Sequence, residues 1–461
     1  MFKLLKLLAL NYWQLLVLTV VLVISSFALF QPHLFRVHDY VHGARIAQMT
    51  LALKDGHLPV IWTRDFGFGY GMPLFQFYAP LPYYVGSFFY LVGFSLSNAV
   101  RVLFLVPNLV SLVGAYFLGK KLFQSKLSGV LLASSFTLAS YRGLNLFVRG
   151  AVSESWGMMT YPWILLASLL VIQEKRWGWL LLTISLTTLL LSHNLSVVMF
   201  LPFAVLTTVI VWLVYLWQEE KLKNLKQLFQ TEIKTFLIFV VSYLLAFGLS
   251  AFYTVPAFLE KSFTQVEKMV LGGYFNYRLH FIYLRQLLKD NWGYGGSTWG
   301  PNDDITFFLG WGQWLGLALA LTVVIVFFSL VAWCLIKNRN LSQVFKSRLL
   351  KLLRASLLTV SFLLIMGWTI LLATEKTLLI WQSFEFLKFL QFPWRYLSVA
   401  VMFLSLVIAV LPTFTRLFKL NLWRWLIFGL SGLVILIVSA TSMRYFRPKA
   451  YLKKCITWGF T

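Results

Sequence analysis

The chain consists of apolar runs of about twenty residues that are separated by shorter polar segments. The first run extends from about Leu7 to Phe30. Within the runs apolar residues are continuous and do not alternate with polar ones, which predicts membrane-spanning helices and not the strands of a barrel. We therefore expect an all-α, polytopic bundle of about eleven spans, in which residues 1–441 form the transmembrane part.

Composition agrees with this pattern and excludes several other classes of protein. Hydrophobic residues make up 59% of the chain and charged residues 12%, whereas a soluble domain carries about 25% charged residues. The net charge of +25 is concentrated in short loops between apolar runs, and no nucleic-acid-binding motif is present, so no nucleic-acid partner is expected. Two widely separated cysteines, Cys334 and Cys455, cannot form a disulfide framework.

Basic residues in short loops predict how the chain is threaded. Lys3 and Lys6 place the N-terminus in the cytoplasm. The apolar segment 79–96 is ambiguous: if it crossed, the basic cluster at 120–126 and every later loop would change sides. Its prolines and tyrosines favour a position in the outer interface, which leaves that cluster in the cytoplasm. The further cytoplasmic segments are then 174–176, 219–234, 337–354 and 416–424. The outer segments are 31–99, 141–153, a turn near Ser192, 257–305, 374–395 and the C-terminal residues 442–461.

The first outer segment contains the stretch "HDYVHGARI", residues 38–46. The pattern from His38 to Lys54 predicts an amphipathic helix that lies on the membrane. At about 100° per residue, His38, His42 and Arg45 share one face of this helix, and Asp39 lies beside them. Asp39 is either a helix cap or dipole partner, or a carboxylate held at the lipid–water boundary with His and Arg to orient a substrate.

The stretch "LPVIWTRDFGFGYGMPLFQFYAPLPYY" follows, at residues 58–84. Glycines alternate with aromatic residues here, but no strand–turn–helix pattern surrounds them, so a nucleotide loop is not indicated. The stretch is either an interfacial aromatic belt or a surface on which a sugar ring or prenyl chain stacks. Asp65 within it is a candidate substrate-binding residue.

Other candidates lie at the outer ends of later spans. Arg149 and Glu154 are either a snorkelling arginine and a helix-start acid, or substrate-binding groups in which Glu154 faces Asp39. His193 is either a hydrogen-bonded turn residue or a substrate ligand. Arg395 is either a membrane anchor or a clamp on a lipid phosphate, which a planar guanidinium suits.

A long glycine-rich segment, "NWGYGGSTWGPNDD", occupies residues 291–304. Long loops are often functional, and Trp292 is a candidate sugar-binding residue. Asp303 and Asp304 alone are weak evidence for a divalent metal, so no cofactor is predicted. We expect Asp39, His42 and Glu154 to converge on one cavity that opens to the outer leaflet.

Several of these stretches together resemble a known family. The segment 38–84 and four others are similar to bacterial multi-pass membrane proteins of the family described as 6-pyruvoyl-tetrahydropterin synthase-related. The four others are "RGAVSESWGMMTYPW" (149–163), "LSHNL" (191–195), "NWGYGGSTWGPNDDITFFLG" (291–310) and "QFPWRYL" (391–397). Nothing in the chain looks like the soluble synthase. The family in turn resembles the GT-C superfamily of glycosyltransferases.

The resemblance implies an integral-membrane glycosyltransferase that takes a sugar from a polyprenyl-phosphate-linked donor. It also implies a catalytic carboxylate in the first outer loop, and Asp39 matches it. The acceptor would be a glycan or protein at the outer face, and membrane lipids would surround the site. Related chains often continue into an outer soluble region, so residues 442–461 are expected to be a short external tail or the start of a truncated region.

Two other functions stay open: a non-enzymatic transporter or flippase of lipid-linked oligosaccharides, and a protein of cell-envelope assembly. A transporter predicts charged or broken spans at the membrane midplane. All six histidines and most acids instead fall on the predicted outer side. An assembly protein needs no convergent polar cluster there.

The threading predicts which positions a membrane-impermeant thiol reagent reaches. In a background with Cys334 and Cys455 replaced by alanine, Ser125→Cys and Ser347→Cys should stay unlabelled in intact cells and react after permeabilisation. His57→Cys, in the first outer segment, is the positive control. Labelling of either serine position from outside would show that the chain is threaded the other way.

Overall fold

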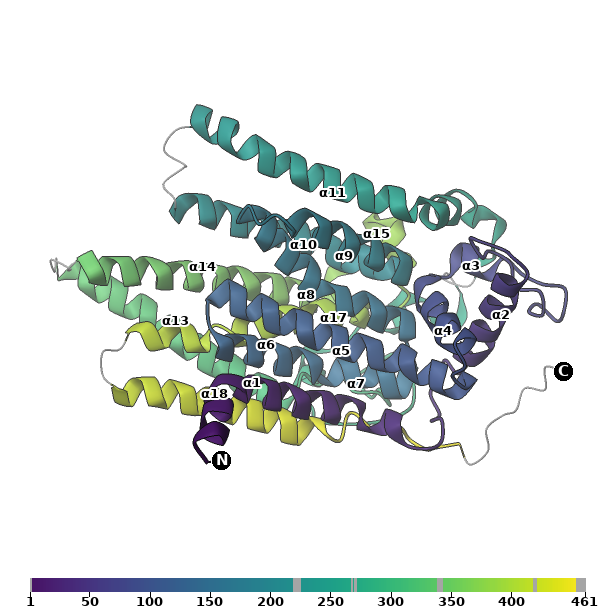
Figure 1. The fold of residues 1–461 in the computed structure, drawn as a ribbon, viewed down its shortest axis with the longest axis horizontal. Helices are drawn as coiled ribbons and strands as arrows, with labels where there is room; N and C mark the ends of the chain where they lie inside the picture. Colours follow the sequence, from purple (N-terminus) through teal and green to yellow (C-terminus); the bar gives the residue numbers. More distant parts are fainter. Residues whose placement is uncertain are drawn as a thin grey trace.

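The computed structural model describes residues 2–218, 225–266, 268, 272–337, 343–417 and 421–452. These residues form an all-α bundle whose long helices run along one axis, with a group of short helices at one end (Figure 1). The extended pairing described is limited to two isolated bridges, Phe35 with Tyr451 and Thr63 with Met72. The predicted polytopic helical bundle is thus confirmed.

Nine helices in the described part of the chain are long and apolar enough to cross a membrane. They are α1 (Phe2–Ser26), α5 (Leu96–Phe123), α8 (Val152–Ile172), α10 (Asn194–Gln218), α11 (Leu225–Leu259), α13 (Trp311–Ile336), α14 (Gln343–Leu372), α17 (Leu397–Ile408, with its flanking turns) and α18 (Asn421–Ser442). The other two predicted spans correspond to the shorter helices α6 (Lys126–Thr137) and α9 (Gly178–Ser192). In the described part of the chain, nine helices are therefore long enough to span a membrane, whereas the sequence predicted about eleven.

The remaining elements are short and lie in the segments between these helices. They include α2 (His42–Lys54), α3 (Leu74–Phe77), α4 (Leu81–Leu91), α7 (Ser140–Leu144), a π-helical turn (Asn145–Arg149), α15 (Leu378–Ser383), α16 (Glu385–Lys388) and a 3-10 turn (Pro393–Tyr396). The ambiguous segment 79–96 forms α4, which is 11 residues long. At 1.5 Å per residue it extends about 16 Å, roughly half of the hydrocarbon thickness. A helix of this length is too short to cross the hydrocarbon core on its own.

The predicted helix 38–54 begins four residues later than expected. Its first helical residue is His42, and Val41 at the N-cap makes no side-chain cap. The backbone N–H groups of His38 and Asp39 instead donate to the carbonyls of Val148 and Arg149, at 3.0 and 2.9 Å. Pairing with a distant segment therefore holds these two residues extended. The interpretation of Asp39 as a helix cap is wrong, and His38 does not share a helix face with His42 and Arg45.

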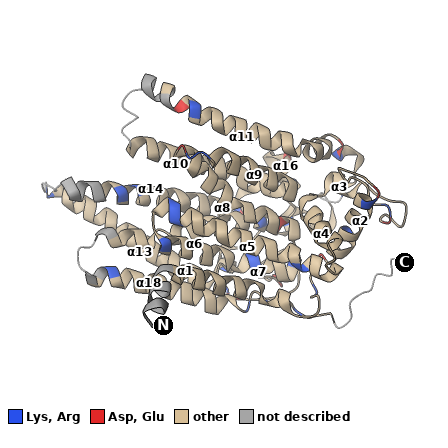
Figure 2. Ribbon diagram, in the orientation of Figure 1, with Lys and Arg blue, Asp and Glu red and all other residues tan. Residues whose placement is uncertain are grey.

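The polar segments separate to the two ends of the bundle. Figure 1 places α2, α3 and α4 at one end of the bundle, and the end of α13 at the other. Figure 2 shows that most charged residues lie near these ends and that the middle of the long helices is largely uncharged. This distribution suits a chain whose helices are embedded in lipid along their middle.

Close contacts between helices depend on small residues and on tryptophans that donate to backbone. Pro107 inside α5 cannot donate to the carbonyl of Leu103, and Trp156 of α8 donates to that carbonyl at 2.8 Å. Trp163 of α8 donates to Val110 of α5 at 2.9 Å. Where α5 meets α6, an added Cβ at Gly129 would lie 2.6 Å from the Tyr116 carbonyl oxygen. Such close approach is typical of helix packing in membranes.

Gly129→Ala tests this contact. Because its Cβ would meet backbone, α5 and α6 must separate, and overpacking of this kind costs about 1–3 kcal/mol. The midpoint of thermal unfolding in detergent should therefore fall. Gly248→Ala in α11 is the matched control, because an added Cβ there meets nothing within 4 Å. The control should be neutral or slightly stabilising, since alanine favours a helix over glycine by about 0.5–1 kcal/mol. Equal midpoints for the two variants would contradict the packing described.

Candidate functional site

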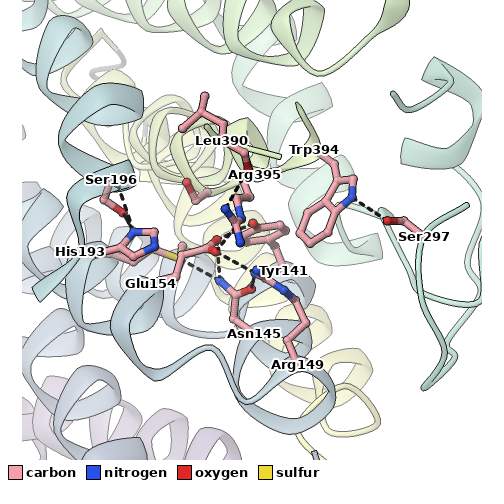
Figure 3. A network of polar contacts seen from close by, with 12 residues as sticks. Tyr141, Asn145, Arg149, Glu154, His193, Ser196, Ser297, Leu390, Trp394 and Arg395 are labelled. Atoms are coloured by element: carbon pink, nitrogen blue, oxygen red, sulfur yellow. Dashed lines mark hydrogen bonds and ion pairs between the residues drawn. The ribbon is translucent and has the colours of Figure 1, made fainter. Parts of the chain in front are cut away.

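The side chain of Glu154 is the centre of a buried polar network (Figure 3). It lies in the first turn of α8 and is 2% exposed. Its Oε1 accepts from the Tyr141 hydroxyl at 2.6 Å and from Asn145 Nδ2 at 3.1 Å. Its Oε2 accepts from Arg149 Nη1 at 2.8 Å and lies 3.5 Å from Arg395 Nε. Both carboxylate oxygens thus have donors, which a buried charge requires.

The sequence around this network explains why its donors converge. Tyr141, Asn145 and Arg149 are four residues apart on consecutive helical turns, so their side chains share one face. Gly150 then reverses the chain with φ +68°, and α8 begins at Val152. An added Cβ at Gly150 would lie 2.8 Å from the Asp39 carbonyl oxygen. A glycine is therefore required both by the turn and by the first outer loop packed on it.

Two arginines share the single carboxylate. Arg395 also donates from Nη1 to the Leu390 carbonyl at 2.8 Å, and the guanidinium of Arg149 lies 4.6 Å from the centre of the Trp394 ring. Burial alone would lower the pKa of Arg149, but Glu154 and Tyr141 raise it above its ordinary value. Arg149 is therefore charged, and Arg395 is charged because a guanidinium is not deprotonated in proteins. With the one carboxylate of Glu154, the group carries an excess of one positive charge. Neither is a snorkelling anchor, because both side chains are nearly buried.

Asp39 belongs to a second group of contacts, in the first outer loop. Arg45 Nη1 lies 3.2 Å from Asp39 Oδ2 and donates to the Tyr83 hydroxyl at 2.9 Å. That hydroxyl lies 3.0 Å from His42 Nδ1, and His42 Nε2 lies 2.7 Å from the Gly150 carbonyl oxygen. Since a carbonyl only accepts, Nε2 carries the proton and Nδ1 accepts from Tyr83. Burial lowers the pKa of His42, so its ring is neutral and its 4.0 Å approach to Asp39 is no ion pair at pH 7.

The two groups are neighbours. The backbone of Asp39 is bonded to that of Arg149, and His42 is bonded to Gly150. Tyr78 adds a further link: its ring lies 4.2 Å from the Arg45 guanidinium, and it contributes to the raised pKa of both Arg45 and Arg149. The Asp39 side chain is one-third exposed, while Glu154 is buried. An accessible carboxylate therefore lies beside a buried group with excess positive charge.

His193 also lies next to Glu154, in the turn between α9 and α10 (Figure 3). Its Nδ1 accepts from the backbone N–H of Ser196 at 3.1 Å and lies 2.8 Å from the Ser196 hydroxyl. This is the hydrogen-bonded turn residue that the sequence suggested. Its position beside Glu154 also keeps it among the candidates for the site.

Three predicted site residues lie outside this network. His38 Nε2 is 3.0 Å from the Tyr294 carbonyl oxygen. Asp65 accepts from Gln48 at 2.6 Å, further along the first outer loop. Trp292 packs against Tyr445, with ring centres 5.1 Å apart. The contacts of His38 and Trp292 join segments that are far apart in sequence, that of Asp65 lies within one loop, and none of the three reaches Glu154.

Sequence reasoning missed five residues of the network: Tyr78, Tyr83, Tyr141, Asn145 and Trp394. Tyr78 and Tyr83 belong to the aromatic stretch for which two interpretations stayed open, an interfacial belt or a surface on which a sugar ring or prenyl chain stacks. Tyr141 and Asn145 precede Arg149 at intervals of four, and that spacing was the available signal. Trp394 lies beside Arg395 in "QFPWRYL".

Within the described residues, no group of three His, Cys, Asp or Glu side chains lies close enough to hold a metal ion. Asp303 accepts from Gln286 at 2.6 Å and from the Thr298 backbone at 2.8 Å, which is a structural role in a loop.

Comparison with known proteins gives little beyond the architecture. No protein-family model and no curated protein matches the chain, so membership of the 6-pyruvoyl-tetrahydropterin synthase-related family is not supported. Among solved structures, the chain is similar to a mutant form of the arabinofuranosyltransferase AftD from mycobacteria, with a TM-score of 0.49 and 13% sequence identity. The match covers 96% of this chain and 29% of that one, so this chain spans less than a third of the matched protein. A likeness of this degree decides no activity.

Glu154→Gln tests the network. The glutamine keeps the shape but leaves two buried guanidinium groups without a counter-charge. Breaking a buried ion pair in this way costs about 3–5 kcal/mol, so thermal unfolding in detergent should begin at a clearly lower temperature. Glu385→Gln is the matched control, because Glu385 is 87% exposed and pairs with Lys388 at the surface. Its effect should stay within about 0.5 kcal/mol. A Glu154→Gln protein as stable as the control would contradict the arrangement.

Proposed function

We propose that the protein is an integral-membrane glycosyltransferase that transfers a sugar from a polyprenyl-phosphate-linked donor to a glycan or protein acceptor at the outer face. One observation supports this proposal above the others. The carboxylate of Asp39 is accessible, and the backbone N–H of Asp39 donates to the carbonyl of Arg149. The guanidinium of Arg149 in turn shares the Glu154 carboxylate with that of Arg395. A proton acceptor thus adjoins a group suited to a phosphate.

Each part has a chemical role in the proposed reaction. Asp39 accepts the proton of the acceptor hydroxyl as a general base. The oxygen attacks the anomeric carbon while the bond from that carbon to the phosphate oxygen breaks, and the polyprenyl phosphate leaves with the electron pair. Arg149 and Arg395 stabilise the negative charge that develops on the phosphate. A single displacement of this kind inverts the anomeric centre.

The supporting residues keep these groups in place. The chain of hydrogen bonds from Arg45 through Tyr83 and His42 to Gly150 fixes Arg45 against Asp39. Glu154 compensates part of the arginine charge and leaves a net attraction for an anion. The phosphate of a lipid donor would meet this charge at the end of the bundle that carries the first outer loop.

One observation favours a transporter as the second candidate. Arg142 is 2% exposed, and its Nη2 donates to the Pro107 carbonyl and to Asn108, at 3.1 and 3.2 Å, near the middle of α5. Charged groups at this depth are typical of transport pathways. Arg142 is enclosed by Phe136 and by α5, which suits a structural role equally.

Asp39→Asn separates the enzyme from the transporter. The amide keeps the size of the side chain and an acceptor for Arg45, but it cannot take up the proton, so transfer should fall about 10²–10⁴-fold. Mass spectrometry of cell-surface glycans from cells with and without the protein identifies the product. The variant is then tested for restoring that product.

Asp55→Asn is the matched control, because Asp55 is an exposed partner of Arg64 in the same loop. It should restore the product fully. A folded Asp39→Asn protein with normal product levels would refute catalysis by Asp39. A transporter predicts that result, since moving a lipid-linked glycan needs no base.

A further inference from the structure

A cavity of about 530 Å³ lies among the outer segments, apart from the Asp39–Glu154 network. Three stretches line it: Arg278 with Phe281–Arg285, Trp299 with Gly300, and Thr374–Lys376. Its volume lies within the range of small-molecule sites. None of its lining residues belongs to the network described above, so a separate function has to be considered.

The cavity carries an excess of positive charge. Arg278, Arg285 and Lys376 line it, against the single carboxylate of Glu375. None of the three cations forms an ion pair with another residue in the described ranges. Guanidinium groups suit carboxylates and phosphates because their donors are planar and paired. The cavity therefore favours an anion.

Two aromatic side chains accompany these charges. Trp299 is 75% exposed and Tyr283 is 39% exposed, although both residue types are usually buried at least in part. The negative face of an aromatic ring attracts the weakly positive C–H groups of a sugar ring. Exposed Trp and Tyr beside cations are therefore suited to a charged carbohydrate.

The walls are held in place by hydrogen bonds. Asp303 accepts from Gln286 and from the Thr298 backbone, which joins the turn before Trp299 to the turn after Tyr283. The Ile282 backbone donates to the Ala373 carbonyl at 2.9 Å, which fixes the third wall. The cavity is thus built from loops that are bound to each other.

The same loops reach the Glu154 network. The Ser297 hydroxyl accepts from Trp394 Nε1 at 3.1 Å, and Arg149 lies over the Trp394 ring. A single residue, Thr298, separates Ser297 from Trp299. An occupant of the cavity would therefore lie on the face of the protein that carries the proposed reaction.

We propose that this cavity binds the acidic part of the acceptor, a glycan that carries carboxylate or phosphate groups. The proposal rests on the proposed glycosyltransferase function and assigns its acceptor site. Arg278, Arg285 and Lys376 bind the anion, and Trp299 stacks on a sugar ring. A lipid headgroup would satisfy the cations, but it would leave Trp299 without a sugar ring to stack on.

Calorimetric titration of the full chain in nanodiscs of neutral lipid tests the assignment. The probes are hexagalacturonate, phosphorylated maltohexaose, neutral maltohexaose and a short-chain phosphatidylglycerol. At least one acidic glycan should bind, and maltohexaose should bind at least ten-fold more weakly. Arg285→Gln and Lys376→Gln should each weaken acidic-glycan binding about 10- to 100-fold, because hydrogen bonds to charged groups are lost.

Matched variants separate this site from other surfaces. Arg64→Gln removes an exposed arginine from the first outer loop and should leave binding unchanged. Glu375→Gln removes the one negative charge and should not weaken binding of the anion, whereas Trp299→Ala should weaken it several-fold. Loss of binding in Arg64→Gln to the same degree as in Arg285→Gln would show non-specific attraction and overturn the proposal.

Two further results would overturn it: no binding of either acidic glycan, or binding of phosphatidylglycerol alone. Failure of the proposed function has a different signature. Arg395→Gln should abolish transfer and leave probe binding intact. If the wild type transfers no sugar but binds acidic glycans through Arg285, the glycosyltransferase proposal fails and the binding site stands.

Discussion

The buried carboxylate of Glu154 is the interaction on which the outer half of the structure depends. A charge in a bundle surrounded by lipid is tolerated only when it is paired and fully hydrogen-bonded. Glu154 meets this condition with hydrogen-bond donors from the segment before α8, and it forms an ion pair with Arg395 in the turn that begins the fully buried span at Pro393. One side chain of α8 therefore joins segments that are more than 200 residues apart in sequence.

The position of the first outer loop follows from that arrangement. Arg149 is fixed by Glu154, and its backbone carbonyl then accepts from Asp39. His42 bonds to the next residue, Gly150, so the start of α2 rests on the same turn. The partly exposed carboxylate of Asp39 is thereby held in place by the buried ion pair between Arg149 and Glu154. Preorganisation of this kind is what a catalytic carboxylate needs, because it avoids the cost of ordering the loop when a substrate binds.

The architecture could be predicted from the sequence because the thickness of the hydrocarbon core sets the length of each apolar run, and these lengths can be counted directly in the sequence. The same rule explains the count that differed, since α6 and α9 are apolar but short. The start of α2 could not be predicted, because the extended backbone of His38 and Asp39 depends on pairing with Val148 and Arg149.

The candidate site was predictable only in part. Asp39, Arg149, Glu154 and Arg395 were identified as charges in apolar surroundings, which is a strong signal. Tyr83 carried no such signal, because tyrosine is equally common at a membrane interface, and Tyr141 was marked only by its spacing of four residues from Asn145. Trp292 packs on Tyr445, and an aromatic residue in a long loop gives no indication in the sequence of which neighbour it will contact.

The pairing of residues 34–36 with residues 450–452 has a consequence for biogenesis. Arg36 donates to the Ala450 carbonyl and Leu452 donates to that of Leu34, around the bridge between Phe35 and Tyr451. The first of these segments leaves the ribosome near the start of synthesis and the second only after α18 has been made. The loop that carries Asp39 therefore lacks this pairing until α18 and residues 450–452 have been synthesised.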